Sequence, residues 1–188
     1  SALVVGLAAC GGSSEPKLLG VVQQPALVVG DVSLPATDGR EVPFRSAEGE
    51  LLVIYFGYTS CPDICPTTLN DTRIALDELP DELAARVTVA FATVDPERDT
   101  AEVVDGYVGS FVERSIGLRT ENPDELAAAA AALGVQYEVA EHEPGDRTYE
   151  VGHSAVTYVI DDSGTLVVEW PFGFTPDNMA SDLRSILS

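Results

Sequence analysis

Two cysteines, Cys61 and Cys65, are the residues of this chain best suited to chemistry. They stand four positions apart, directly after the apolar run 51–56. Along a helix, this spacing puts both side chains on one face, about 6 Å apart along the axis. A disulfide tolerates Cα separations of roughly 4.4–6.8 Å, so the pair can close into one. Cys61 and Cys65 can therefore cycle between dithiol and disulfide, bind a metal as thiolates, or form a plain crosslink.

The start of a helix is the expected place for these cysteines, because a turn follows the buried strand that precedes them. The positive end of the helix dipole should lower the pKa of Cys61. Pro62 and Pro66 flank the motif. Because proline cannot donate a backbone hydrogen bond, we predict a partly irregular first turn.

The two histidines, His142 and His153, are candidates for a third metal ligand. His153 stands immediately before the apolar segment 155–160, whereas His142 lies in the acidic, turn-like segment 140–145, where we expect it to be exposed. A lone histidine beside a strand is usually structural, so for His153 a structural role and a ligand role both stay open. Two thiolates with one imidazole form a soft site that suits Cu(I) and can hold Cu(II). Structural zinc would need a fourth ligand, while catalytic zinc with three protein ligands remains an alternative.

Composition excludes some partners. The 188 residues carry a formal charge of −21, from 31 acidic and 10 basic residues, and 45% are hydrophobic. This composition suits one globular domain with a tail. Nucleic acid and anionic membrane surfaces would repel such a protein, whereas a basic protein partner would not. Three cysteines are too few for a disulfide-stapled scaffold.

The N-terminus carries the third cysteine. Residues 1–9 form an apolar run too short to span a bilayer, and Leu7–Cys10 resembles a bacterial lipobox. We predict that residues 1–9 are the remnant of a lipoprotein signal peptide. Acylated Cys10 would then begin a lipid-anchored flexible tether over residues 10–26. The protein would lie on the extracytoplasmic face of the bacterial cell membrane, held by its lipid alone. A ragged apolar terminus with a stray cysteine is the alternative.

Apolar segments, turn residues and helix caps predict the order of the elements. Strands are predicted at 27–29, 32–34, 42–44, 51–56, 87–94, 135–139, 155–160 and 165–170, with turns at Asp38-Gly39 and at 161–164. Helices are predicted from the cysteines to Pro80, over about 100–112, from Asn122 to Gly134, and from Thr175 to Leu187. This order is typical of a thioredoxin-like three-layer α/β sandwich with an N-terminal β-hairpin and an inserted helix, covering 27–188. In that layout the loop before 155–160 passes close to the dithiol.

Three sequence blocks resemble the Sco/SenC family. Phe56–Thr67 is similar to the family signature, and Asp95–Thr100 and Gly152–Ser154 are similar to two further blocks in the same order. The resemblance implies a membrane-tethered, extracytoplasmic copper-binding protein that assists assembly of the CuA centre of cytochrome c oxidase. It matches Cys61, Cys65 and His153 to the family's copper ligands. The implied partners are the CuA domain of oxidase subunit II and either another copper chaperone or a thioredoxin-like reductant. Many relatives are tethered by a transmembrane helix instead of a lipid.

The block Asp95–Thr100 has two interpretations. Asp99 with Glu102 forms an acidic capping pattern at the start of a helix, which would account for Asp99 and Thr100. Asp95 and Arg98 would then simply end a strand. Alternatively, Asp95 and Arg98 lie near the metal loop, where they support the ligands or dock a partner.

The dithiol leaves more than one function open. Besides a copper metallochaperone, the chain could be an enzyme, a thiol–disulfide reductase that keeps the CuA cysteines of the oxidase reduced without transferring copper. It could also be a non-catalytic lipoprotein in which Cys61–Cys65 is a structural disulfide. Peroxidase activity is less well supported, since no specific polar pocket for a peroxidatic cysteine is evident. The reductase needs only the dithiol, whereas the metallochaperone also needs His153.

Overall fold

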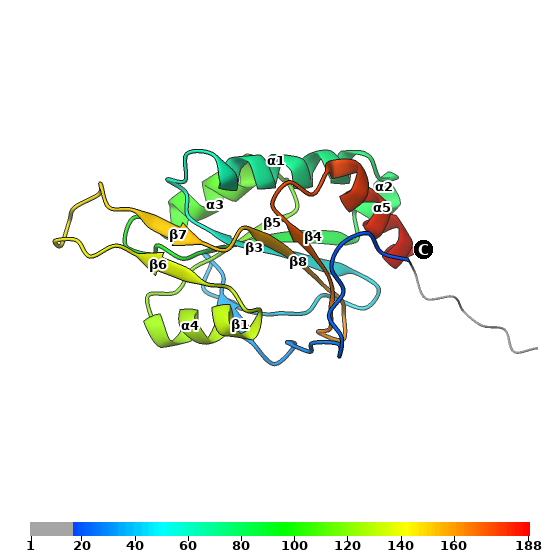
Figure 1. Cartoon of the computed structure of the whole chain (residues 1–188), viewed down its shortest axis with the longest axis horizontal. Coiled ribbons are helices and arrows are strands. Elements are labelled where there is room, and N and C mark those ends of the chain that lie inside the picture. The colour runs from blue at the N-terminus through cyan, green and yellow to red at the C-terminus, as the bar shows by residue number, and fades with distance from the viewer. Residues whose placement is uncertain (1–16) are drawn as a thin grey trace, which may run out of the picture.

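The computed structural model describes residues 17–188, and a five-stranded mixed sheet lies at its centre (Figure 1). The strand order is β5–β4–β3–β8–β9. The strands are β3 (Leu51–Gly57), β4 (Val87–Thr93), β5 (Ser115–Leu118), β8 (Val156–Ile160) and β9 (Leu166–Pro171). β3, β4 and β5 run parallel, whereas β8 is antiparallel to β3 and β9 is antiparallel to β8.

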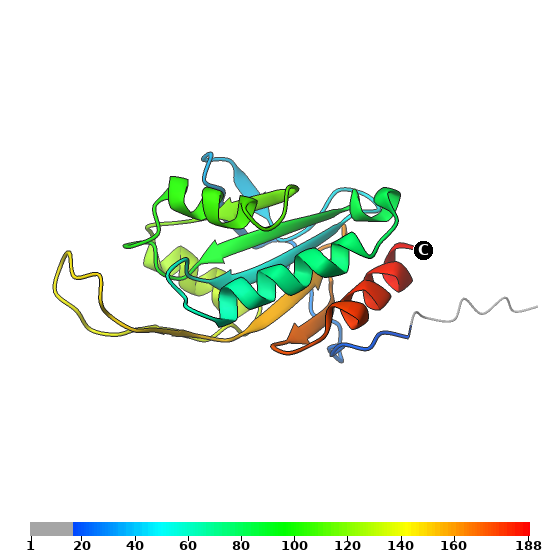
Figure 2. The same ribbon diagram turned by 90° about the horizontal axis from the view of Figure 1, so that it is seen from above.

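Helices cover one face of this sheet, and a helix with a small hairpin covers the other (Figures 1 and 2). The first face carries α1 (Ile64–Asp77), α3 (Ala101–Gly109) and α5 (Pro176–Leu187), and the short helix α2 (Asp81–Ala84) follows α1. The second face carries α4 (Pro123–Ala132) and the hairpin of β1 (Ser33–Pro35) and β2 (Glu41–Pro43). The predicted thioredoxin-like three-layer sandwich is therefore confirmed.

The central strand β3 is apolar along its whole length because both of its faces are covered. Leu51, Val53 and Tyr55 pack toward α1 and α5. Leu52, Ile54 and Phe56 pack toward α4 and the β1–β2 hairpin. All of these side chains are buried, and each contributes roughly 1.5–3 kcal/mol through burial of apolar surface. Because β3 is buried on both faces, the loop that follows it begins from a fixed position.

Two further strands form an arm that projects beyond the end of the central sheet (Figures 1 and 2). β6 (Tyr137–Val139) pairs with β7 (Val151–His153) in antiparallel register, and residues 140–150 connect them. We call residues 137–153 the arm. The sequence predicted a strand near β6 but not β7. His153 is therefore the last residue of a strand, three residues before β8 begins.

Other local differences from the sequence prediction lie at the sheet edges. Residues 27–29 contribute only an isolated bridge, between Val28 and Thr165. β5 was not predicted, because Ile116 and Leu118 are its only large apolar residues and Gly117 separates them. Among residues 17–188, no helix has the length and apolar character needed to cross a bilayer.

The chain contacts the domain before residue 27, where the sequence placed the end of the tether. The amides of Leu19 and Gly20 donate to the carboxylate of Asp182, at 2.7 and 3.1 Å. Val21 pairs with Glu169 on β9 and so covers part of that edge strand. The predicted signal remnant, Cys10 and the first part of the tether lie outside the described residues.

Candidate metal centre

The end of β3 and the start of α1 carry the two cysteines. β3 ends at Gly57, a loop follows, and α1 begins at Ile64. Cys61 lies in the loop, and Cys65 is the second residue of the helix. Asp63, just before the helix, has a non-helical backbone (φ −143°, ψ −62°), so the turn is irregular, as predicted. Pro66 fits in the first turn of α1 because the amides there have no intrahelical partner.

The sulfur of Cys65 is tightly enclosed. Its side chain is fully buried, and that of Cys61 is 9% exposed. A Cβ atom at Gly57 would lie 2.8 Å from Cys65 Sγ and 3.0 Å from the Phe91 ring. Only a residue without a side chain leaves room for the sulfur at this point.

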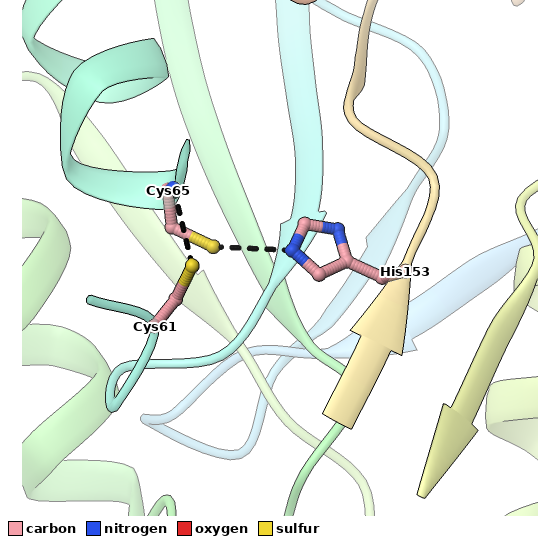
Figure 3. Close-up of side chains that lie close together, drawn as sticks. All are labelled: Cys61, Cys65 and His153. Atoms are coloured by element: carbon pink, nitrogen blue, oxygen red, sulfur yellow. Dashed lines mark hydrogen bonds between the residues drawn. The ribbon is translucent and has the colours of Figure 1, made fainter. Parts of the chain in front are cut away.

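His153 completes a cluster with the two thiols (Figure 3). Its Nε2 atom lies 3.3 Å from Cys65 Sγ, and the three donor atoms of Cys61, Cys65 and His153 all lie within 4.8 Å of one another. The other ring nitrogen, Nδ1, lies 3.1 Å from the Ser154 carbonyl oxygen. Since a carbonyl can only accept, Nδ1 carries the proton, and the lone pair of Nε2 points at the thiols.

Backbone amides act unequally on the two thiols. Burial opposes ionisation of Cys61, but hydrogen bonds from the amides of Cys65 and Asp63 outweigh it and lower the pKa of Cys61 below its usual 9.0. This direction was predicted from the sequence. Burial raises the pKa of Cys65 to about 12. Burial also lowers the pKa of His153 from 6.5, which keeps its imidazole neutral and able to bind a metal.

Asp99 does not cap α3, and this part of the sequence prediction is wrong. Thr100 is the N-cap residue, and its side chain accepts from the amide of Val103. The Asp99 carboxylate instead accepts from Thr59, two residues before Cys61. A short polar side chain at a helix start is the usual signal of a cap. Here two such residues are adjacent, and the second one has that role.

Asp95 and Arg98 lie beside the arm. They form a buried ion pair, and both contact Tyr149, which comes just before β7. Neither forms a hydrogen bond with Cys61, Cys65 or His153. The structure therefore places them near the site, on the side of His153.

His142 lies away from the thiols, in the loop of the arm. Its ring stacks on Tyr149 at 3.6 Å between centroids, and its nitrogens contact Glu97 and the Ala140 carbonyl. The side chain is only 14% exposed, so the expectation that it is exposed is wrong. Its acidic, turn-like sequence gave no sign of the stacking partner.

The donor set is chemically suited to a soft metal ion. In the part of the chain that the structure describes, Cys61, Cys65 and His153 are the only group of three or more clustered metal-ligating side chains. Two thiolates and one neutral imidazole favour copper over metals that prefer oxygen ligands. Both cysteines are free thiols in this structure. Their pairing as a disulfide stays a prediction.

Fold and site together define a thioredoxin-like protein with a dithiol–imidazole centre. The chain belongs to the SCO1/SenC family, whose model matches residues 21–188. This assignment agrees with the resemblance seen in the three sequence blocks.

Individual relatives support the assignment. Protein SCO1 homolog 1, mitochondrial, from Arabidopsis thaliana is 38% identical over 135 residues, which cover 72% of this chain and 40% of that protein. The solution structure of apo Sco1 from Thermus thermophilus is 32% identical, with a TM-score of 0.78 over 93% of this chain and 99% of that one. Bradyrhizobium japonicum ScoI with copper bound is 33% identical, with a TM-score of 0.70 over 84% and 98%.

Proposed function

We propose that this protein is an extracytoplasmic copper metallochaperone that assists assembly of the CuA centre of cytochrome c oxidase. The observation that carries the proposal is the meeting of two thiols and one imidazole within 4.8 Å. The family of the chain supports copper as the metal, since a relative at 33% identity has been solved with copper bound. In this function, the copper bound by this protein is delivered to oxidase subunit II.

Each residue of the site has a role in this function. Cys61 and Cys65 supply thiolates, and His153 supplies the Nε2 lone pair. Cys61, with its lowered pKa, loses its proton more readily, whereas Cys65 must lose a proton held at a pKa of about 12. Metal binding therefore releases protons, and oxidation of the pair to a disulfide would abolish the site.

A thiol–disulfide reductase is the second candidate function. It is favoured by the position of the dithiol at a helix start in a thioredoxin-like fold and by the lowered pKa of Cys61. This enzyme would keep the CuA cysteines of subunit II reduced without carrying copper. It would not require His153.

One experiment separates the two functions. A soluble CuA fragment of oxidase subunit II is prepared with its cysteines reduced and, separately, with them as a disulfide. The metallochaperone predicts that the Cu(I)-loaded protein transfers copper to the reduced fragment, which then shows the CuA absorption spectrum after one-electron oxidation with ferricyanide. His153→Ala should give no such spectrum. No transfer to the reduced fragment, together with reduction of the oxidised fragment by the metal-free dithiol, would instead establish the reductase.

Anchoring by a lipid on Cys10 is part of the same proposal. The apolar residues 1–9 and the lipobox-like Leu7–Cys10 support it. In Figure 1 the described chain begins near the C-terminus, at the end of the domain away from the arm. A tether would therefore join the domain at the end opposite the metal site. The test is fractionation of cells expressing the full precursor: Cys10→Ala should move the protein out of the membrane fraction, and retention there would refute the lipid anchor.

A further inference from the structure

We propose that the loop between β4 and α3 fixes the relative position of the two halves of the metal site through Asp95, Arg98 and Asp99. One half is the loop that carries Cys61, and the other is the arm that carries His153. The inference rests on the proposed metal site and assigns positioning residues to it. None of the three side chains forms a hydrogen bond with a ligand residue.

Asp99 fixes the half that carries the thiols. Its carboxylate accepts from the amide of Thr59 at 3.0 Å and from the Thr59 hydroxyl at 2.5 Å. It also accepts from the Thr93 hydroxyl, at the end of β4, at 2.6 Å. Asp99 is fully buried, so these bonds are shielded from water and strengthened by its charge. The loop before Cys61 is thereby tied to the end of β4.

Arg98 and Asp95 fix the half that carries the histidine. Arg98 Nη1 donates to the carbonyl oxygens of Tyr149, at 2.9 Å, and Arg147, at 3.3 Å. Asp95 accepts from Arg98 Nε and, at 2.6 Å, from the Tyr149 hydroxyl. The guanidinium carbon lies 3.9 Å from the centre of the Tyr149 ring. Tyr149 is held at three points, two residues before β7 leads to His153.

Arg98 also reaches toward the first half. Its guanidinium carbon lies 5.5 Å from the centre of the Tyr58 ring. The Tyr58 ring in turn meets the His153 ring edge-on, at 5.8 Å between centroids. A single buried cation thus contacts an aromatic residue from each half of the site.

Buried ion pairs contribute little net stability, because removing two charges from water offsets their attraction. The Asp95–Arg98 pair, 1% and 8% exposed, is therefore better explained by the position it fixes. Arg119, which directly follows β5, provides a matched comparison, because it donates to the carbonyls of Asp99 and Pro96 in the β4–α3 loop. Arg119 forms no hydrogen bond with the arm.

The test compares Arg98→Met with Arg119→Met, because each removes one cation and two hydrogen bonds to backbone carbonyls. Those of Arg98 go to the arm, whereas those of Arg119 go to the β4–α3 loop. In the metal-free, reduced protein, Arg98→Met should speed amide hydrogen exchange at residues 149–153 by about tenfold or more. Copper affinity should fall about 10–100-fold, as for loss of other outer-shell partners. Arg119→Met should leave both quantities within about threefold of wild type.

Two further variants complete the test. One is a milder change in the arm, in case Arg98→Met fails to fold, and the other tests the half that carries Cys61. Tyr149→Phe removes only one hydroxyl from Asp95 and should change arm exchange and copper affinity in the same direction as Arg98→Met. Asp99→Asn should instead shift the thiol–disulfide exchange constant of Cys61 and Cys65, which Arg98→Met should leave within about threefold.

Unchanged amide hydrogen exchange at residues 149–153 in both Arg98→Met and Tyr149→Phe would overturn the inference. Equal effects of Arg98→Met and Arg119→Met on copper affinity would also overturn it, since the loop would then act only through general stability. The exchange measurement needs no copper. Failure of the wild-type protein to bind copper would therefore refute the proposed function and leave the positioning result to be judged separately.

Discussion

Cys65 Sγ and His153 Nε2 lie 3.3 Å apart although the two residues are 88 positions apart in the chain. The pairing of β3 with β8 brings them together, since Tyr55, two residues before the end of β3, lies opposite Thr157 near the start of β8. Because Nδ1 of His153 holds its proton against the Ser154 carbonyl, the Cys65 thiol donates to Nε2 in the metal-free state. A metal ion would take the place of that proton.

The two thiols should differ in reactivity. With its pKa lowered, Cys61 should be alkylated by iodoacetamide at a rate that rises as its thiolate forms, at a lower pH than for an ordinary cysteine. Cys65, with a pKa of about 12, is only roughly 0.1% ionised at pH 9 and should react at least about tenfold more slowly. Peptide mapping by mass spectrometry after timed labelling between pH 6 and 9 measures both rates.

Cys61→Ser is the control for this labelling, because it leaves Cys65 as the only thiol of the pair. Labelling of Cys65 should remain slow in that variant. Equal labelling of the two cysteines in the wild-type protein would contradict the assignment of the more acidic thiol.

Gly57 should be sensitive to the smallest substitution. The added methyl group of Gly57→Ala would lie 2.8 Å from Cys65 Sγ, so we expect a loss of about 1–3 kcal/mol in the free energy of unfolding and weaker copper binding. Gly152→Ala is a matched control, because it adjoins His153 and its added carbon would meet no atom within 4 Å. Urea unfolding measures stability, and wild-type stability of Gly57→Ala would contradict the close packing of the sulfur.

Asp182 should hold the N-terminal segment on the domain. Its buried carboxylate accepts from the amides of Leu19 and Gly20 and from the indole of Trp170. Asp182→Ala leaves these donors without a partner, so the free energy of unfolding should fall by about 3 kcal/mol. Hydrogen exchange at Leu19 and Gly20 should also become faster. Exposed Asp31 provides the control: Asp31→Ala should stay within about 0.5 kcal/mol of wild type, and a similarly small loss for Asp182→Ala would refute the anchoring role.

Much of the fold could be predicted from local sequence patterns. The uninterrupted apolar runs of β3 and β4 are typical of strands buried on both faces. The turn at Asp38-Gly39, where Gly39 has φ +85°, was also predicted correctly. The helix caps Asn122 and Thr175 follow the same local rules, and both accept the capping hydrogen bonds expected of them. These features depend on neighbours a few residues away, which a sequence displays directly.

Features that depend on distant partners could not be predicted in this way. Asp99 has the composition of a helix cap, but its partner Thr59 lies forty residues earlier in the chain. β5 forms because β4 offers it a parallel edge, although its own apolar pattern is weak. His142 is covered by Tyr149 across the arm. In each case the decisive contact belongs to the tertiary structure.

The candidate site shows the same division. The pattern around Cys61 and Cys65 was recognisable because both residues lie in one short segment. His153 could be linked to them only through the expected fold and the family resemblance. The contribution of Tyr149 could not be seen in the sequence, because nothing near it indicates a contact with Asp95 and Arg98.

Copper titration of the reduced wild-type protein beside His153→Ala tests whether His153 is the third ligand of the copper site, with His142→Ala as the matched control. Wild type and His142→Ala should bind one equivalent of copper and show thiolate-to-Cu(II) charge-transfer absorption. His153→Ala should lose that spectrum, and its affinity should fall by more than the roughly 10–100-fold that loss of an outer-shell partner costs. Copper binding by His153→Ala with unchanged affinity and spectrum would contradict a site built from Cys61, Cys65 and His153.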